Sequence, residues 1–447
     1  MPSHSITPVL IAGGGPAGIA LLLAASRHGE LPRLLDEGLT LVEQGNHIGS
    51  GMLGRYVINS DSAAETFVDV LADNPVPELA QLCTHPLVEH IRSHGKQTLP
   101  LRTVAEYLDL VGHVLAALIR RHPASRLLTG WRLTSLRHGD RGGWSACLVS
   151  TDGAQTQHVT ARRVVLALGA NQPEQRLHNE PVGGRPLLPY CQGRLMQSDD
   201  LLSPTGISRL RAMVAGAGKP RIAIVGGASS ALSVARVILR DMKELIAPGH
   251  LALLHKSRLK LFYRTAEEAL ADGYTDFGPA DICPISQFVY RFGGLRYDSR
   301  DLAMRLMGVA NAPPESRLQT IQMTNSNEGQ VRAVLDSADA VIACLGYRPR
   351  RMAIMDRYNR FIPLATDHPQ GNLTGADCAI LDEAGRAIPG LFGLGLAAGY
   401  SPATTMGGER SFTGQVNSLW LWQNAIGEKI LYQLLPASAP LPRIAVA

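Results

Sequence analysis

The sequence lacks the paired cysteines that mark several classes of protein. The cysteines are Cys83, Cys147, Cys191, Cys283, Cys344 and Cys378. No two of them form a Cys-x-x-Cys pair, so the chain has neither the spacing of a zinc knuckle nor the dithiol motif of a disulfide reductase. We therefore expect reduced, intracellular thiols.

The chain also has no run of charge of one sign. Its 43 basic and 38 acidic residues give a formal net charge of +5, without the basic clusters of a nucleic-acid or membrane-surface binder. The apolar stretch from Pro8 to Ser26 is interrupted by glycines and preceded by no Lys or Arg, unlike a signal peptide or membrane span. These absences predict a cytoplasmic enzyme that acts on a small molecule and has no nucleic-acid or membrane partner. They do not decide whether the protein forms a homo-oligomer.

A fixed catalytic constellation is missing too. We find no Ser/His/Asp arrangement, no paired carboxylates and no spacing that predicts a metal site. With 447 residues, 45% of them hydrophobic, the chain can bury the cores of two or three domains. Chemistry supplied by a bound cofactor is consistent with this composition.

What the chain does have is a glycine-rich turn after a strand-like run, Val9 to Gly18, followed by a helix to about Arg27 and a strand from Leu39 to Glu43. This pattern predicts a βαβ unit that binds a dinucleotide. The first glycine permits the turn, the second admits a pyrophosphate and the third lets the helix pack closely. Glu43 would accept a hydrogen bond from a ribose hydroxyl of the nucleotide. The alternative is that Glu43 merely ends a strand. The predicted contacts are Gly13, Gly15, Pro16, Ala17, Gly18, Glu43 and Gln44.

A second such turn runs from Ile222 to Ala231, with Ala228 in place of the middle glycine. Its second strand, His250 to His255, leads into the basic segment Lys256 to Lys260. Cations at this point suit the 2′-phosphate of NADPH, whereas an NADH site would carry a carboxylate. NADPH is therefore favoured over NADH. The predicted contacts are Gly226, Gly227, Ser229, Ser230, Lys256 and Arg258.

The order of these patterns predicts an α/β protein with two Rossmann-like dinucleotide-binding domains, the NADP domain inserted into a discontinuous FAD domain. We expect the FAD-binding domain to comprise residues 1–190 and 346–447 and the NADPH-binding domain to comprise residues 191–345. A Pro-rich tail, expected on the surface or disordered, ends the chain.

Local patterns predict further elements. Thr103 to Glu106 matches a capping box before an amphipathic helix that reaches Ile119. The short β-like runs from Trp131 to Gly169 predict a hairpin followed by a central parallel strand, and Leu318 to Leu335 a second hairpin. Gly414 to Leu435 is expected to form the C-terminal helix.

The segment Cys191 to Leu201, before the second turn, resembles the Phe-x-Gly-x-x-x-His-Ser motif of flavin-dependent monooxygenases with two dinucleotide-binding domains. Gly193 and Ser198 match that motif, whereas Cys191 and Gln197 depart from it. The resemblance implies that Gly193 and Ser198 lie at a cofactor, and that Gln197 replaces a His that couples cofactor binding to chemistry. A glutamine can orient a cofactor but cannot become cationic near neutral pH. The alternative is that Gln197 is an ordinary linker residue.

Other segments extend the resemblance over nearly the whole chain. Ala343 to Tyr347 is similar to the Ala-Thr-Gly-Tyr strand end of the family, which implies cofactor contacts for Gly346 and Tyr347. Gly49 to Leu53 resembles the Trp-His-x-Gly-Met-Leu segment of N-hydroxylating members, which implies that Met52 and Leu53 lie near the flavin. Gly49 and Ser50 stand where the Trp and His are expected.

The stretches Arg55-Tyr56 and Asn59 to Ser62 resemble instead segments of Baeyer–Villiger members of the family. Arg55 is a candidate cation for stabilising an anion or a peroxide, although a solvated surface arginine would look the same. Asp61 is the third candidate catalytic residue, beside Gln197 and Arg55.

The resemblance implies a monooxygenase dependent on FAD and NADPH that uses O2 and a flavin C4a-(hydro)peroxide to oxygenate a small metabolite. N-hydroxylation of an amine or amino-acid-derived compound is the first expectation, and Baeyer–Villiger or S-oxygenation is the alternative. A flavin oxidase or reductase without oxygen insertion, and a flavin-binding protein that has lost activity, also remain open.

Overall fold

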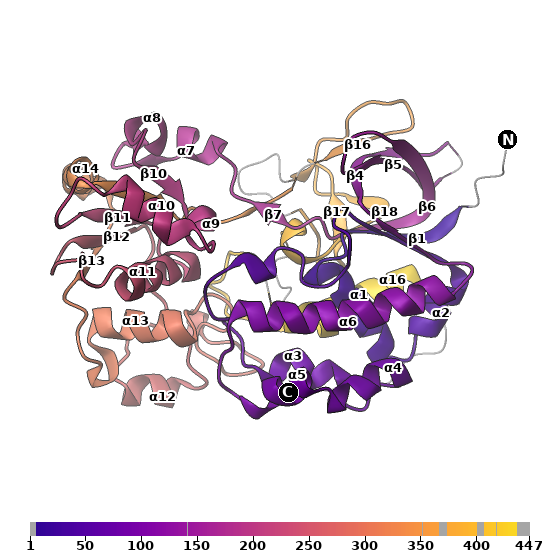
Figure 1. The fold of residues 1–447 in the computed structure, drawn as a ribbon, viewed down its shortest axis with the longest axis horizontal. Helices are drawn as coiled ribbons and strands as arrows, with labels where there is room; N and C mark the ends of the chain where they lie inside the picture. The colour runs from indigo at the N-terminus through magenta and orange to yellow at the C-terminus, as the bar shows by residue number, and fades with distance from the viewer. Residues whose placement is uncertain are drawn as a thin grey trace.

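The computed structural model describes residues 6–140, 142–350, 352–365, 373–399, 406–416 and 418–435. In this part of the chain two α/β units lie side by side (Figure 1). The first unit is built from both ends of the chain, and the second from its middle.

The first unit is organised around a nine-stranded sheet of order β16-β4-β5-β6-β1-β2-β3, with β17 and β18 joined beside β6. Its strands are β1 (Thr7–Ala12), β2 (Leu39–Glu43), β3 (Arg126–Thr129), β4 (Trp131–His138), β5 (Trp144–Ser150), β6 (Thr156–Leu166), β16 (Ala353–Met355), β17 (Ala379–Leu381) and β18 (Ala387–Gly393). Strands β1, β2, β3, β6 and β18 run parallel, whereas β4, β5 and β6 form an antiparallel meander. The expected hairpin and central strand are thus present, because the long β6 pairs with β5 antiparallel and with β1 and β18 parallel.

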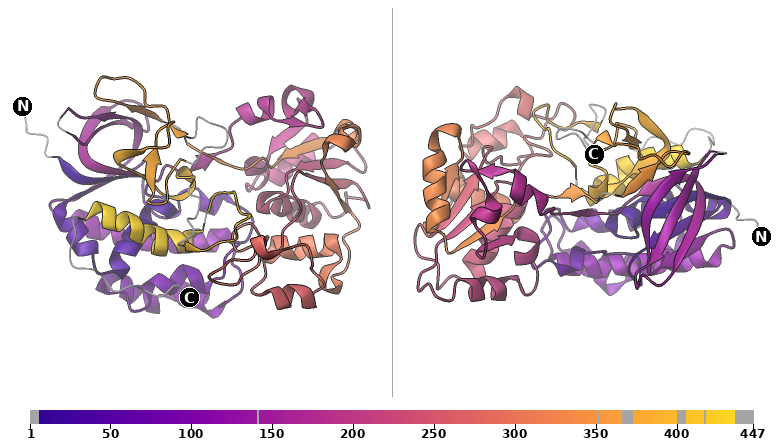
Figure 2. Two further views of the ribbon diagram at one scale, coloured as in Figure 1. Left: turned by 180° about the vertical axis from the view of Figure 1, so that it is seen from behind. Right: turned by 90° about the horizontal axis from the view of Figure 1, so that it is seen from above.

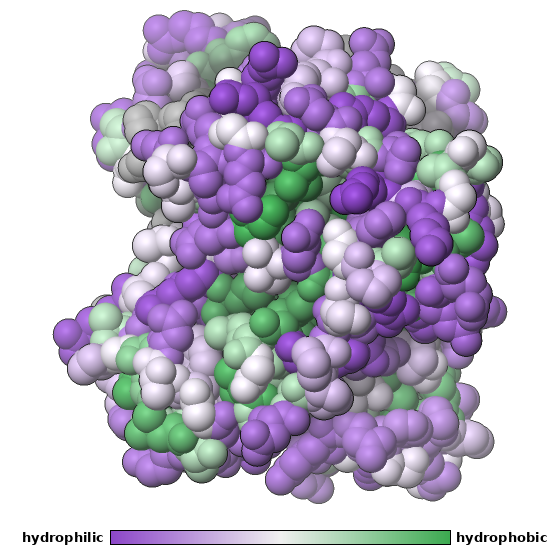
Figure 3. Space-filling view, turned by 90° about the vertical axis from the view of Figure 1, so that its left-hand side faces the viewer, coloured by the Kyte–Doolittle hydropathy of each residue, from purple (hydrophilic) through white to green (hydrophobic). Residues whose placement is uncertain are grey.

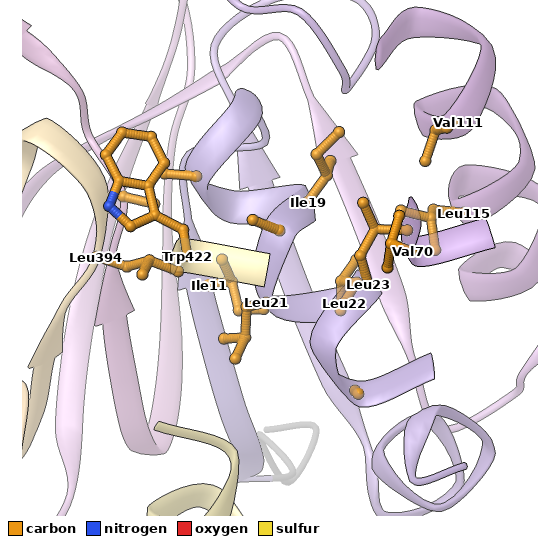
Figure 4. Close-up of a cluster of buried hydrophobic side chains, with 14 of the residues drawn as sticks. Ile11, Ile19, Leu21, Leu22, Leu23, Val70, Val111, Leu115, Leu394 and Trp422 are labelled. Carbon is orange, nitrogen blue, oxygen red and sulfur yellow. The ribbon is translucent and has the colours of Figure 1, made fainter. Parts of the chain in front are cut away.

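Helices cover this sheet. Those of the first unit are α1 (Pro16–Arg27), α2 (Leu31–Glu37), α3 (Glu65–Val68), α4 (Pro77–Ala80), α5 (Pro86–Ser93), α6 (Leu101–Arg121), α15 (Leu419–Leu421) and α16 (Gly427–Leu434), with a π-helical turn at Trp422–Ile426. Helix α1 is buried from Ala17 to Ser26 between the sheet and its helical neighbours. Trp422 of the C-terminal segment lies beside Leu394 in this core (Figure 4).

Two details of the expected helices are wrong. Helix α6 begins at Leu101 after Pro100, without a side-chain cap, so the predicted capping box at Thr103 lies inside the helix. The C-terminal helix begins at Leu419 rather than Gly414. The Pro-rich tail lies outside the described residues.

The second unit has a five-stranded, fully parallel sheet of order β10-β14-β11-β12-β13. Its strands are β10 (Leu195–Gln197), β11 (Ile222–Val225), β12 (Leu251–His255), β13 (Leu318–Gln322) and β14 (Ala340–Ala343), and its helices include α9 (Ser198–Leu201), α10 (Gly206–Met213), α11 (Ser229–Asp241), α12 (Ala266–Ala271), α13 (Tyr297–Met307) and α14 (Glu328–Ser337). The predicted hairpin at Leu318 to Leu335 is wrong. Strand β13 is followed by helix α14, which buries Val331 and Leu335, four residues apart, on one face.

The two units are joined by a short antiparallel pair, β7 (Ala170–Asn171) and β15 (Arg348–Pro349). Figure 1 labels β7 between the units, and Figure 2 shows the chain crossing between them from behind and from above. Helices α7 (Gln175–Asn179) and α8 (Leu187–Tyr190) follow the first crossing, and Leu177 and Leu187 already belong to the core under the second sheet. The predicted fold class, two Rossmann-like units with the second inserted into the first, is confirmed by this topology.

The outer side of the second unit is largely hydrophilic, with a band of hydrophobic residues across its middle (Figure 3). Among the described residues, no helix combines the length and apolarity needed to cross a membrane. Nor does the described part of the chain hold a group of three His, Cys, Asp or Glu side chains fit to bind a metal ion.

Candidate active site

The first glycine turn is packed so tightly that two of its glycines cannot carry a side chain. Gly13 has a φ of +105°, and a Cβ there would lie 2.2 Å from the carbonyl oxygen of Ala167. A Cβ on Gly18 would lie 1.9 Å from the carbonyl oxygen of Gly13. Gly15 differs, because the atom nearest to its added Cβ is 3.6 Å away. The turn is thus closed on its inner side and open at Gly15.

Helix α1 starts directly from this turn, with Gly15 as its N-cap and Pro16 and Ala17 in its first turn, and no side chain caps it. Its first N–H groups therefore leave a place for an anion at the carboxyl end of β1. Glu43 ends β2 and accepts hydrogen bonds from the backbone N–H groups of Gly14, at 2.6 Å, and Gly45, at 2.7 Å. The neighbouring Gln44 is exposed.

In the segment that departs from the Trp-His pair of N-hydroxylating enzymes, Gly49 has no room for a side chain. Gly49 has a φ of +143°, and a Cβ there would lie 2.6 Å from both Asp109 Oδ1 and the carbonyl oxygen of Leu108. The N–H of Ser50 donates to the same Asp109 oxygen at 2.8 Å. The segment is thereby held on helix α6, with Gly51 against Gly15 of the turn.

The three residues that follow differ in exposure. Met52 is 49% exposed, whereas Leu53 packs on the first core. Arg55 ends a short 3-10 helix, Leu53–Arg55, and is half-buried.

The second turn repeats the geometry of the first. Gly226 has a φ of +144°, and its added Cβ would lie 2.5 Å from the carbonyl oxygen of Cys344; that of Gly227 would lie 2.7 Å from His255 Cβ. Ala228, the N-cap of α11, has a φ of −97°, which any residue can adopt, so the alanine causes no strain. No side chain caps α11 either, which leaves its N-terminus, including Ser229 and Ser230, ready for an anion.

The two cations that follow β12 differ in their surroundings. The guanidinium of Arg258 forms ion pairs with Asp276 and, at 3.1 Å, with Asp281. The ammonium of Lys256 is exposed and makes no hydrogen bond or ion pair with any described residue. Of these two cations, only Lys256 forms no ion pair with a described residue.

Between the two units lies a cleft of about 2320 Å³. Predicted site residues that line it are Asp61, Gly226, Gly227, Ser229, Ser230, Lys256, Arg258, Gly346 and Tyr347. The second turn, the basic segment, the end of β14 and one loop of the first unit thus meet around one space. The first turn and the neighbouring Gly51 both lie outside this lining.

The residues of the Phe-x-Gly-like motif spread along β10. Gly193 lies before the strand, exposed, with no atom within 4 Å of an added Cβ. Gln197 ends the strand, and its Nε2 donates to the carbonyl oxygen of Gln172 at 3.3 Å. Ser198 is fully buried, and its hydroxyl accepts from Gln172 Nε2 at 2.7 Å. Gln197 and Ser198 therefore bind the crossing segment after β7.

A hydrogen-bonded cluster that the sequence did not predict joins the units beside the cleft. The hydroxyl groups of Tyr56 and Tyr347 donate to Asp199 Oδ1 at 2.5 and 2.8 Å, and lie 3.2 Å from each other. Burial and the bond to Asp199 raise the pKa of Tyr56 to about 12, and burial raises that of Tyr347 as well. Both phenols thus stay protonated and donate to the carboxylate. Each residue lies in a motif segment, but only the fold brings the three together.

The C-terminal part of the first unit makes a second junction. Glu409, which is buried, accepts hydrogen bonds from the N–H groups of Phe292, at 3.1 Å, and Gly293, at 2.7 Å. Arg291 donates to the carbonyl oxygen of Met406 at 3.0 Å. No sequence pattern pointed to these contacts.

Asp61 lies on the loop of the first unit that reaches the second unit, where Asn59 Nδ2 donates to Asp298 Oδ2 at 3.0 Å. Its side chain opens into the cleft on the side of Arg296, with which it forms no ion pair. Desolvation within the cleft raises the pKa of the Asp61 carboxyl, because it disfavours the charged form, and the charge of Arg296 opposes that shift.

No protein-family profile matches the chain. A curated protein of Streptomyces rubellomurinus, CMP-5′-(3-aminopropyl)phosphonate hydroxylase, is 32% identical over 435 residues, which cover 95% of this chain and 97% of the relative. The chain belongs to the class B flavin-dependent monooxygenases. The resemblance seen in the sequence is thereby confirmed, and this monooxygenase is an enzyme, as predicted.

Solved structures of the same fold include further monooxygenases. The FAD-bound cadaverine monooxygenase of Erwinia amylovora has a TM-score of 0.55 at 12% identity, covering 99% of this chain and all of its own. The ornithine N-hydroxylase of Kutzneria sp. 744, with reduced FAD and NADP+, has a TM-score of 0.54 at 13% identity, covering 96% and 99%. L-lysine 6-monooxygenase from Pseudomonas syringae has a TM-score of 0.53 at 16% identity, covering 96% and 99%.

Proposed function

We propose that this monooxygenase hydroxylates the nitrogen of a terminal primary amine on a nucleotide-linked alkylphosphonate. The observation that carries the proposal is the identity of 32%, over 95% of the chain, to a hydroxylase named for CMP-5′-(3-aminopropyl)phosphonate. The fold shared with an ornithine N-hydroxylase supports nitrogen as the atom that is oxidised.

The proposed FAD site is the first glycine turn. The open side of Gly15 and the uncapped N-terminus of α1 fit a pyrophosphate, and Glu43 lies where a ribose hydroxyl would follow. Met52, beside the turn, would border the ring system. Bound FAD supplies the redox chemistry with O2, while the side chains bind, orient and exclude water.

The proposed NADPH site is the second turn, on the cleft. The uncapped N-terminus of α11 fits the pyrophosphate, with the hydroxyl groups of Ser229 and Ser230 beside it. Lys256 fits the 2′-phosphate, because its ammonium forms no ion pair with a described residue, whereas the charge of Arg258 is balanced by two carboxylates.

Lys256→Ala is expected to raise the KM for NADPH about tenfold and to leave that for NADH almost unchanged, because one charge-assisted contact to the 2′-phosphate is lost. Steady-state kinetics with both nucleotides measure the effect. Arg258→Ala serves for comparison, since its ion pairs predict loss of thermal stability rather than loss of NADPH selectivity. Equal loss with both nucleotides in Lys256→Ala would remove Lys256 from the 2′-phosphate site.

Asp61 fits the amine. A carboxylate facing the cleft can hold a substrate ammonium group, and its raised pKa makes it a better acceptor for the proton that the nitrogen must lose before it can attack as a nucleophile. A ketone or a thioether would make no use of this carboxylate. We therefore favour N-hydroxylation over Baeyer–Villiger and S-oxygenation.

The test is a substrate panel for the FAD-loaded enzyme with NADPH and O2, in which NADPH consumption and product mass are both followed. CMP-5′-(3-aminopropyl)phosphonate, free 3-aminopropylphosphonate, ornithine, a thioether and a ketone form the panel. We expect a hydroxylamine from the nucleotide-linked amine at the highest kcat/KM. A sulfoxide or an ester as the best product would overturn the proposal.

A further inference from the structure

The chain between β12 and β13, residues 256–317, forms one wall of the cleft, and its Arg296 faces Asp61 of the first unit. An extended stretch, Lys260 to Tyr263, is paired on one side with Leu295 and on the other with Val289. A Cβ on Gly294 would lie 2.7 Å from the N–H nitrogen of Phe262, so only a glycine allows this close pairing. The pairing brings Lys260, Phe262 and Arg296 together at the surface of the cleft.

Four cations on this wall have no carboxylate partner. Lys260, Arg264, Arg291 and Arg296 line the cleft, and none forms an ion pair with a described residue. Other cations of the same region are paired: Arg258 as above, and Arg300 with Asp272 at 3.3 Å. Two carboxylates of the first unit act on the charge of Arg296, Asp61 and Glu409, and Glu409 already accepts hydrogen bonds from two backbone N–H groups. Three carboxylates of this wall, Glu268, Asp298 and Asp301, also line the cleft, but the cations outnumber them, so the wall carries a net positive charge toward the cleft.

Arg296 is held in a fixed orientation. Its guanidinium lies 3.6 Å above the centre of the Phe262 ring and donates to the carbonyl oxygen of Arg291 at 2.7 Å. Phe288 packs edge-on against the same ring, 5.5 Å from it. Stacking of this kind leaves the edge of the guanidinium free to bind oxygens in a forked manner.

The part of the first unit that faces this wall carries mostly the other sign. Asp61, Glu65 and Asp69 line the cleft there, together with the single cation Lys96. A ligand that fits between the two walls has a cationic and an anionic end. These cations are not needed for the proposed NADPH site at the second glycine turn, because Lys256 would provide the cation there.

We propose that Lys260, Arg264, Arg291 and Arg296 bind the phosphate and phosphonate oxygens of the amine substrate and so direct its amine toward Asp61. The assignment rests on the proposed function for the identity of the amine. The enzyme would then select an amine that is linked to phosphate or phosphonate groups over the free amine, because an alkylamine without phosphorus oxygens cannot bind these cations.

Two variants of the FAD-loaded enzyme test the proposal: Lys260→Gln with Arg264→Gln, both at the cleft surface, and Arg296→Gln. For each, the KM for CMP-5′-(3-aminopropyl)phosphonate is expected to rise about tenfold or more, with the KM for NADPH unchanged. Turnover of propylamine, which has no anionic group, is expected to fall far less than turnover of the nucleotide-linked amine. Lys219→Gln, an exposed lysine outside the cleft, is the matched control and should change none of these values.

A binding measurement separates this proposal from the proposed function. CMP is expected to raise the melting temperature of the wild type and of the control, and to do so much less in the two variants. If no amine is hydroxylated, the proposed function fails, while this pattern of CMP protection would still support an anion site. Unchanged KM and CMP protection in both variants, or a rise in the KM for NADPH instead, would overturn the proposal.

Discussion

Gly18→Ala is expected to give a protein that no longer retains FAD and unfolds at a markedly lower temperature. Its new Cβ would lie 1.9 Å from the carbonyl oxygen of Gly13, and Gly13 itself cannot yield because its own inner side is closed by Ala167. Helix α1 must then move off β1, and overpacking of this kind costs about 3 kcal/mol. Flavin content after purification and the melting temperature measure the result.

Gly329→Ala is the matched control, because Gly329 also lies in a helix, α14, and no atom lies within 4 Å of an added Cβ. It should bind FAD normally and gain slightly in stability, since alanine is the better helix former. Retention of FAD by Gly18→Ala at the level of this control would contradict the claim that the flavin site depends on the tight inner packing of the first turn.

Asp61→Asn is expected to lower kcat/KM for the amine about hundredfold while the KM for NADPH stays unchanged. The amide keeps the shape of the side chain but can neither pair with an ammonium group nor take its proton. Asp73→Asn, the same change at an exposed residue of the first unit outside the cleft, should have no effect. A variant as active as this control would exclude Asp61 from amine recognition.

Asp61→Asn is also expected to stabilise the folded protein, by an amount that depends on pH. The pKa of Asp61 is raised in the folded state, so the folded protein holds the proton more tightly than the unfolded chain does. The stabilisation from that proton is complete below the ordinary Asp pKa and is lost as the pH rises through the raised value. Asp61→Asn should therefore melt at a higher temperature than the wild type at neutral pH, and the difference should shrink toward pH ~4.

The two glycine turns could be predicted from the sequence because their requirement is local. Gly13 and Gly226 take positive φ values beside a neighbouring strand, and only glycine satisfies that geometry. A strand, such a turn and a helix of small and apolar residues then determine a βαβ unit. The position of Lys256 directly after the second strand could also be predicted, because the end of that strand marks where a ribose substituent would lie.

Other features depend on contacts between distant segments. Arg258 follows the same strand, yet Asp276 and Asp281 neutralise it only once the insertion is folded. The bond between Tyr56 and Asp199 joins residues 143 apart. The misread stretch Leu318 to Leu335 shows the same limit at short range, because a strand followed at once by a helix can imitate two strands.

The central claim, that the enzyme places an oxygen atom from O2 on the nitrogen of a nucleotide-linked amine, is tested most directly with isotopically labelled dioxygen. The purified, FAD-loaded enzyme would receive NADPH and CMP-5′-(3-aminopropyl)phosphonate, and the product would be fragmented in a mass spectrometer. The account predicts one labelled oxygen atom, located on the amine nitrogen. A product with unlabelled oxygen, with the label on carbon, or with no added oxygen despite NADPH consumption would contradict it.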